Sequence, residues 1–210
     1  MSADHWASEL GMGDYRATSY DRFARFLHWT VALLVFAASA LGIWASNIGP
    51  NHPDRDVYEF RETLLFWHKS LGLTVLGLML LRLVWALANR NARPPLPDHL
   101  PRHERFLAKS VHYGFYMLLF ALPPSGTILS QSAGFEVSFF GLFTLPQIVP
   151  VDLSVPVPER VGVQLGVLVH KQVLAYVLYG MLSLHLLGVI KHHFIDRDRG
   201  MIRRMWPGRG

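Results

Sequence analysis

The stretch VGVQLGVLVHKQVLAYVLYGMLSLHLLGVI, residues 161–190, decides the fold of this chain. It contains one cation, two histidines and no carboxylate, and its apolar residues form a continuous block. An amphipathic helix of a soluble protein would instead confine its apolar residues to one face. A helix needs about 20 predominantly apolar residues to cross a bilayer. The stretch therefore predicts a membrane-spanning helix.

Three other apolar blocks of similar length precede it, at Phe26–Ser46, Thr63–Ala88 and Lys109–Ser130. The third contains the pair Pro123-Pro124, which a membrane helix tolerates when its neighbours satisfy the freed backbone carbonyls. A soluble helical protein with a large buried core is the alternative. The four blocks favour an all-α membrane protein, a four-transmembrane-helix bundle.

The basic residues flank these blocks unevenly, and such residues are retained in the cytoplasm. One side has only Arg55, Arg61 and Arg160, with Lys69 and Lys171 just inside the helices. The other side has Arg16, Arg22, Arg25, Arg90, Arg93, Arg102, Arg105, Lys109, Lys191, Arg197, Arg199, Arg203, Arg204 and Arg209. We therefore expect both termini in the cytoplasm, with a cytoplasmic arm at residues 1–21, the bundle at 22–195 and a basic tail at 196–210.

The net charge of +5 follows from the same flanking residues. Topology and anionic lipid headgroups explain such a distribution better than nucleic acid, which we do not expect as a partner. Residues 134–159 are rich in Phe and Val but too interrupted by proline to span. We expect this segment, the outer cover, to lie over the outer ends of the helices.

Five of the eleven histidines lie within the apolar blocks, where ionisable residues are costly and suggest function. The fifteen residues from His170 to His185 correspond to about 22 Å along a helix and about 60° around it. Alternating helix directions then sort four histidines into two levels. The outer level has His68 and His170, and the inner level has His28 and His185.

Two imidazoles facing each other across a bundle suit a flat metal macrocycle with one axial ligand on each side. Haem b fits, because its iron takes imidazole nitrogen and its porphyrin is apolar. The alternatives are zinc, a proton relay and simple hydrogen bonding between helices. Zinc favours a tighter cluster with thiols or carboxylates, and the four blocks contain no Asp or Glu. The chain also has no Cys, which excludes disulfides, iron–sulfur clusters and covalently attached haem.

Several short motifs occur in a specific order: RFLHW at the first block, WHKSLG and GLMLLRL in the second, HYGFYMLLFALP in the third, and VHKQ followed by LHLLG in the fourth. In this order the sequence resembles the bacterial cytochrome b561 family, four-helix di-haem b cytochromes of the inner membrane. The resemblance implies axial ligands at His28, His68, His170 and His185, two haems per chain and electron exchange with ubiquinone. Some members of the family are similar to superoxide oxidases, which pass an electron from periplasmic superoxide to quinone.

One spacing departs from the family pattern. The step of fifteen residues between His170 and His185 is one longer than usual, and a π-bulge in the helix would absorb the extra residue. His112 is a fifth histidine at the inner level, where it could replace His28 as a ligand or donate to a haem propionate or to the bundle. Arg82 reaches the same depth and is either a propionate partner or a side chain that extends to the cytoplasmic surface.

Lys69 and Lys171 each directly follow an outer ligand, and Arg61 and Arg160 are expected nearby. Such a cationic mouth would attract a small anion such as superoxide, although the same cations could neutralise propionates. A second reading is a cytochrome b anchor subunit that docks a periplasmic redox protein on residues 47–62 and on the outer cover. A cofactor-free, proton-coupled transporter is a third class, which the absence of central carboxylates disfavours.

Overall fold

A computed structural model describes residues 19–92, 94–96, 100–197 and 203–205. Most of the predicted N-terminal arm, residues 1–18, lies outside this part, as do residues 198–202 and 206–210 of the predicted tail. The flanking cations Arg16, Arg93, Arg199 and Arg209 therefore have no structural description.

Long helices make up most of the described chain. They are α2 (Arg22–Ile48), α3 (Arg55–Ala88), α4 (Arg102–Ser132) and a final helix built from α5 (Val161–Gly166), η3 (Val167–Leu174), α6 (Ala175–Ile190) and η4 (Lys191–Ile195). The segments η3 and η4 are π-helical, while η1 (Arg90–Ala92) and η2 (Val157–Glu159) are short 3₁₀ turns. Asp21 and Asp54 cap α2 and α3 by accepting hydrogen bonds from first-turn backbone amides.

Three of the described helices are long and apolar enough to cross a membrane: α2, α3 and the final helix, Val161–Ile195. Helix α4 has a comparable length of 31 residues. Its apolar part is interrupted by His112, Gly114, Pro123, Pro124 and Ser125, which makes α4 less apolar than the other three. The helix continues through Pro123 and Pro124 to Ser132, as the sequence predicts.

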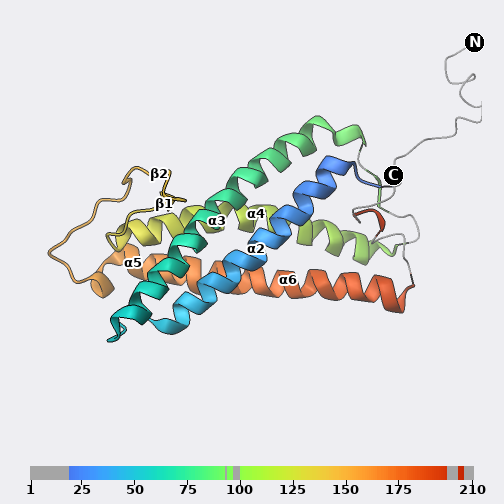
Figure 1. The fold of residues 1–210 in the computed structure, drawn as a ribbon. Helices are drawn as coiled ribbons and strands as arrows, with labels where there is room; N and C mark the ends of the chain where they lie inside the picture. The colour runs from blue at the N-terminus through green and yellow to red at the C-terminus, as the bar shows by residue number, and fades with distance from the viewer. Residues whose placement is uncertain (1–18, 93, 97–99, 198–202, 206–210) are drawn as a thin grey trace, which may run out of the picture.

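Successive long helices run in opposite directions (Figure 1). Helix α2 packs along α3, α3 meets α4, and α4 packs against α5, η3 and α6. The start of α2, the end of α3, the start of α4 and the end of α6 therefore lie at one end of the bundle. At that end Trp29 Nε1 donates to the Met205 carbonyl at 2.7 Å, and the Tyr20 amide donates to the Arg204 carbonyl at 3.2 Å.

The outer cover lies at the opposite end, beside α3 and α5 (Figure 1). It contains a small antiparallel hairpin of β1 (Ser138–Phe139) and β2 (Phe143–Thr144). The buried Ser70 hydroxyl accepts from the Phe140 amide at 3.0 Å and ties the hairpin to α3. The buried Gln131 side chain donates to the Pro146 carbonyl at 2.8 Å and accepts from the Ile148 amide at 3.1 Å. These bonds hold the cover on the middle of α3 and on the end of α4, whereas the sequence predicts it over the outer ends of the helices.

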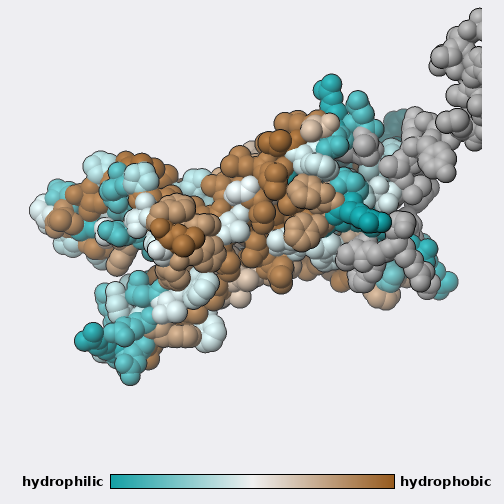
Figure 2. All heavy atoms as spheres, turned by 45° about the horizontal axis from the view of Figure 1, so that its top comes forward, coloured by the Kyte–Doolittle hydropathy of each residue, from teal (hydrophilic) through white to brown (hydrophobic). Residues whose placement is uncertain are grey.

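A thin apolar core joins the helices halfway along their length. In α3 the core residues Val75 and Met79 fall between His68 and Arg82, and in the final helix Leu178 falls between His170 and His185. The cluster comprises Val31, Val35, Val75, Met79, Leu118, Leu119 and Leu178. Few other side chains of the three candidate spans are buried within the chain, and hydrophobic residues cover the middle of the visible face (Figure 2). An apolar layer therefore separates the two histidine levels.

Candidate functional site: two levels of histidine

The outer level brings together the two histidines that the sequence assigns to it. His68 comes from α3 and His170 from the π-helical segment η3. Their ring centroids are 6.1 Å apart, with the ring planes at 77°. Metal–imidazole bonds of about 2 Å put two rings on opposite sides of one metal at a similar separation.

His68 is held by the backbone of α2. Its Nδ1 lies 2.8 Å from the carbonyl oxygen of Ala38. A carbonyl only accepts, so Nδ1 carries the proton and Nε2 keeps its lone pair. The ring rests on Gly42, one turn further along α2, where an added Cβ would lie only 2.8 Å from His68 Cε1. The absence of a side chain at position 42 therefore leaves room for the imidazole.

His170 is held by α4 in a similar way. Its Nδ1 lies 3.0 Å from the hydroxyl oxygen of Ser125, and an added Cβ on Gly126 would lie 2.9 Å from His170 Cε1. Sequence reasoning missed both residues. The Ser-Gly pair directly after Pro123-Pro124 was the available signal, but only the packing of α4 on η3 shows which histidine it meets.

The inner level holds three histidines and one arginine. The His185 ring lies 5.7 Å from that of His112 and 5.6 Å from that of Phe115. His112 Nδ1 donates to the Ala108 carbonyl at 2.6 Å. The structure thus pairs His185 most directly with His112, the residue that the sequence leaves as the alternative ligand.

His28 lies at the same level, close enough to His185 and His112 for electrostatic interaction. Its Nδ1 accepts a hydrogen bond from Arg82 Nη1 at 3.2 Å, while the Arg82 guanidinium lies 6.0 Å from the centre of the Tyr116 ring. Arg82 therefore reaches the inner level rather than the surface. A neutral imidazole that accepts at Nδ1 carries its proton on Nε2. Coordination through Nε2 therefore requires Arg82 to release His28.

The donor set fits haem b. His68, His170 and His112 each have Nδ1 directed at an acceptor, which leaves the Nε2 lone pair that an axial ligand needs. The chain has no thiol, and the apolar blocks have no carboxylate, so the preferred companions of zinc are missing. The imidazoles at each level, set between apolar helices, match an iron porphyrin better.

The predicted cationic mouth is mostly engaged in packing. Lys69 Nζ donates to the Glu136 carbonyl at 3.3 Å and lies 5.9 Å from the centre of the Phe135 ring. Arg160 donates to the carbonyls of Ser132, Ala133 and Val155, and Arg61 pairs with Glu62. Lys171 is exposed. Three of the four cations thus have structural partners at the outer end, and Lys171 faces the surroundings.

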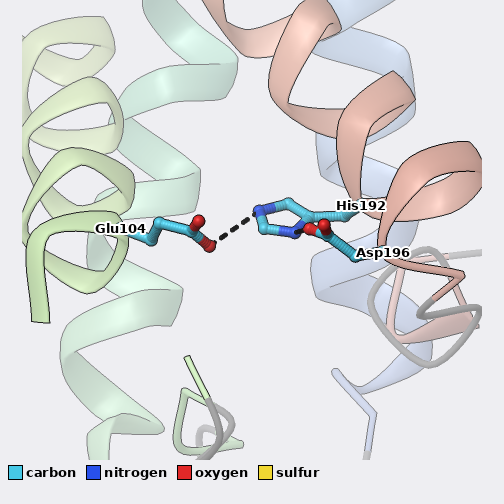
Figure 3. Close-up of side chains that lie close together, drawn as sticks. All are labelled: Glu104, His192 and Asp196. Carbon is cyan, nitrogen blue, oxygen red and sulfur yellow. Dashed lines mark hydrogen bonds and ion pairs between the residues drawn. The ribbon is translucent and has the colours of Figure 1, made fainter. Parts of the chain in front are cut away.

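A separate polar cluster joins the start of α4 to the end of η4. Ligand atoms of Glu104, His192 and Asp196 lie within 4.8 Å of one another (Figure 3). Lys191 Nζ lies 3.0 Å from Glu104 Oε1 and 2.7 Å from Asp196 Oδ2. The hydrogen bond from Lys191 holds the pKa of the Asp196 carboxyl below its usual range. Lys191 thus contacts both carboxylates, and His192 Nδ1 lies 2.8 Å from Asp196 Oδ2, so we describe this cluster as an ion-paired clasp.

Several known proteins are similar to this chain. The family model described as prokaryotic cytochrome b561 matches residues 19–208. The chain is 28% identical to "Cytochrome b561 homolog 2" of Escherichia coli (strain K12) over 186 residues, covering 89% of this chain and 90% of that protein. It is 26% identical to "Probable superoxide oxidase CybB" of Yersinia pestis over 189 residues, covering 88% and 94%. "Cytochrome b561 homolog 1" of the same Escherichia coli strain is 25% identical over 191 residues, covering 88% and 97%.

Proposed function

This chain belongs to the prokaryotic cytochrome b561 family, and on that basis we propose that it is a di-haem b cytochrome that carries electrons across the bacterial inner membrane. Members of the family are helical membrane cytochromes that bind b-type haem and transfer electrons. The observation that carries the proposal is the pair of histidine levels separated by an apolar layer.

We further propose that α4 is the fourth span and that both termini are cytoplasmic. Helix α4, with 31 residues, is longer than α2 and slightly shorter than α3 and the final helix, and it packs between α3 and the final helix. It also contributes Ser125 and Gly126 to the outer level and His112 to the inner level. The basic residues at the end where α2 begins support a cytoplasmic location for that end.

The outer haem would be held by His68 and His170, and the inner haem by His28 and His185. His112 is the second candidate for the inner ligand, because its ring is in contact with that of His185. Arg82 would pair with a propionate of the inner haem, and this exchange of partners would free His28 Nδ1 to hold a proton. Each haem, when bound, supplies a one-electron carrier.

For the reaction we propose oxidation of periplasmic superoxide coupled to reduction of ubiquinone. Each of two superoxide ions loses one electron and becomes dioxygen, and the two electrons with two protons convert ubiquinone to ubiquinol. The similarity to the probable superoxide oxidase supports this donor. Among the outer cations, the exposed Lys171 is placed to attract an anion. Lys69, held by the cover, would act at shorter range beside His68.

The anchor-subunit reading remains the second candidate, and the outer cover favours it. Several of its apolar side chains are exposed, among them Leu142 at 77%, Ile148 at 68% and Leu153 at 81%. A periplasmic redox protein could dock on such a patch. Electrons would then pass between this partner and quinone through the same two haems.

The first test counts the haems and assigns the ligands. Pyridine haemochrome analysis of the purified protein should give two haem b per chain. His68→Ala and His170→Ala should each remove the outer haem, and His28→Ala and His185→Ala the inner one. If His112→Ala removes the inner haem while His28→Ala retains it, His112 is the ligand. One haem per chain would contradict the two-level arrangement.

The second test separates the two candidate reactions. Superoxide should reduce the haems at a rate that falls with added salt, because the Debye length shrinks from about 30 Å at 0.01 M to about 8 Å at physiological ionic strength. Lys171→Glu should slow this step, with Lys109→Glu on the exposed start of α4 as the control. Reduction by neutral ubiquinol should change little in either variant, since only a charged donor is steered. Equal losses with both donors, or no salt dependence, would favour the anchor subunit.

A further inference from the structure

The hydroxyl group of Ser125 has a defined direction in this structure. Ser125 Oγ lies 2.8 Å from the Leu122 carbonyl oxygen and 3.0 Å from His170 Nδ1. A carbonyl cannot donate, so the single hydroxyl proton goes to Leu122. The oxygen is then left with lone pairs only, and the contact with His170 requires the proton to be on Nδ1. In this arrangement Ser125 favours the His170 tautomer that has its proton on Nδ1.

The position is fixed from two sides. Ser125 is half-buried on α4, one turn after the carbonyl that it binds. The next residue, Gly126, provides the surface on which the His170 ring rests. The imidazole therefore cannot move closer to α4, and Nδ1 is the ring nitrogen that meets the serine.

An acceptor at Nδ1 makes the imidazole a stronger donor through Nε2. A stronger axial donor stabilises the more positive, oxidised iron and lowers the reduction potential. Building on the function proposed above, we infer that Ser125 is a positioning residue for the outer haem, which orients His170 and keeps the reduction potential of that haem low. His68 has a backbone acceptor at the same atom, so Ser125 is the member of this pair that a substitution can remove.

The test uses Ser125→Ala and Ser125→Thr in the full-length, haem-loaded protein. Ser183→Ala is a matched control, because the Ser183 hydroxyl makes the same kind of local bond to the Tyr179 carbonyl, at 2.9 Å, on the final helix. Spectroelectrochemical titration resolves the two midpoint potentials, and the one that disappears in His170→Ala is the outer one. The low-spin EPR signal of the same haem gives an independent readout.

We expect Ser125→Ala to raise the outer midpoint potential and shift its EPR signal, while the inner haem stays unchanged. Ser125→Thr should restore both properties because it keeps the hydroxyl group. The Leu122 carbonyl also lies near His170. If it takes over as acceptor in the alanine variant, the potential will not move and the role of Ser125 is overturned. Loss of the outer haem in both variants would also overturn it, whereas loss in the alanine variant alone would support it.

Failure of this inference can be distinguished from failure of the proposed function. A purified wild-type protein without haem, or a His170→Ala variant that keeps both haems, would refute the ligand assignment itself. If two haems are present and His170→Ala removes one, an unchanged potential in Ser125→Ala refutes the serine alone.

Discussion

At the scale of single residues, the glycines beside the outer histidines are the most sensitive positions. A methyl group at Gly42 or Gly126 would lie within 3 Å of an imidazole that packs against backbone. We expect Gly126→Ala and Gly42→Ala each to lower outer-haem content well below one per chain, measured by haemochrome analysis, and to leave the inner haem bound. Gly166→Ala is the control, because its methyl group would meet Leu129 between α4 and α5 without touching a histidine. Equal haem loss in the control would make the effect one of general packing.

The sequence predicts the histidines at this scale but only some of their neighbours. Gly42 contacts the imidazole of His68, and the sequence does not show this contact. Around Gly72, Gly77, Gly180 and Gly188 an added Cβ would have open space. A polar residue in an apolar block can be recognised from composition alone, because its burial is costly wherever it lies. Ser125 becomes meaningful only when another helix brings His170 to it, and one sequence does not contain that contact.

At the scale of elements, the final helix contains the feature that its spacing predicts. The π-helical segment η3 includes His170, so a helix distortion of the expected kind is present, and that it absorbs the extra residue stays a prediction. Deleting Val173 should therefore convert η3 to regular α-helix and still align His170 with His185, so that both haems are retained. Inserting one alanine after Val173 should remove one haem, since a further residue turns a helix by about 100°. Loss of a haem in the deletion variant, measured by haemochrome analysis, would show that the π-helix does not compensate the spacing.

The clasp between α4 and η4 leads to a second prediction, which concerns the stability of these two helix ends. Replacing Lys191 by Gln removes the ammonium group that contacts both the Glu104 and the Asp196 carboxylate. We expect faster amide hydrogen exchange in residues 102–106 and 191–196 at neutral pH, with Lys109→Gln as the control.

The clasp should also depend on pH. The hydrogen bond from Lys191 lowers the pKa of Asp196. The contribution of Asp196 to stability is therefore complete above the ordinary carboxyl pKa of about 4 and is lost as the pH falls through the lower pKa of the folded state. Wild-type protein should therefore loosen at this end only below about pH 4, after correction for intrinsic exchange rates.

At the scale of the whole molecule, the arrangement of the helices makes a topology prediction. Reporter fusions after Arg93 and after Met205 should give cytoplasmic signals, and fusions near Asp54 and Asp152 periplasmic signals. The alternation of helix directions requires the first two sites to agree with each other and to oppose the last two. Disagreement between the Arg93 and Met205 fusions would exclude α4 as a span. A fully inverted pattern would exchange the inner and outer haems.

The sequence predicts the large-scale features well, because the length and apolar character of a helix depend on the residues of that helix alone. The helical bundle and three of the spans follow in this way. Features that depend on a contact between two distant segments cannot be predicted in this way. The hydrogen bond of Lys69 to the cover joins residues 67 positions apart, and the clasp between Glu104 and Lys191 joins residues 87 positions apart.

The apolar layer between the two histidine levels has an electrical consequence. The levels are about 22 Å apart along the final helix, roughly three quarters of a hydrocarbon core of about 30 Å. Moving one elementary charge across the full membrane involves about 2.3 kcal/mol per 100 mV, so an electron that crossed this layer would involve about 1.7 kcal/mol per 100 mV. An electron that travels inward enters a compartment that is already negative. The bundle would thus store part of the redox energy as voltage, and its turnover would slow as that voltage rises.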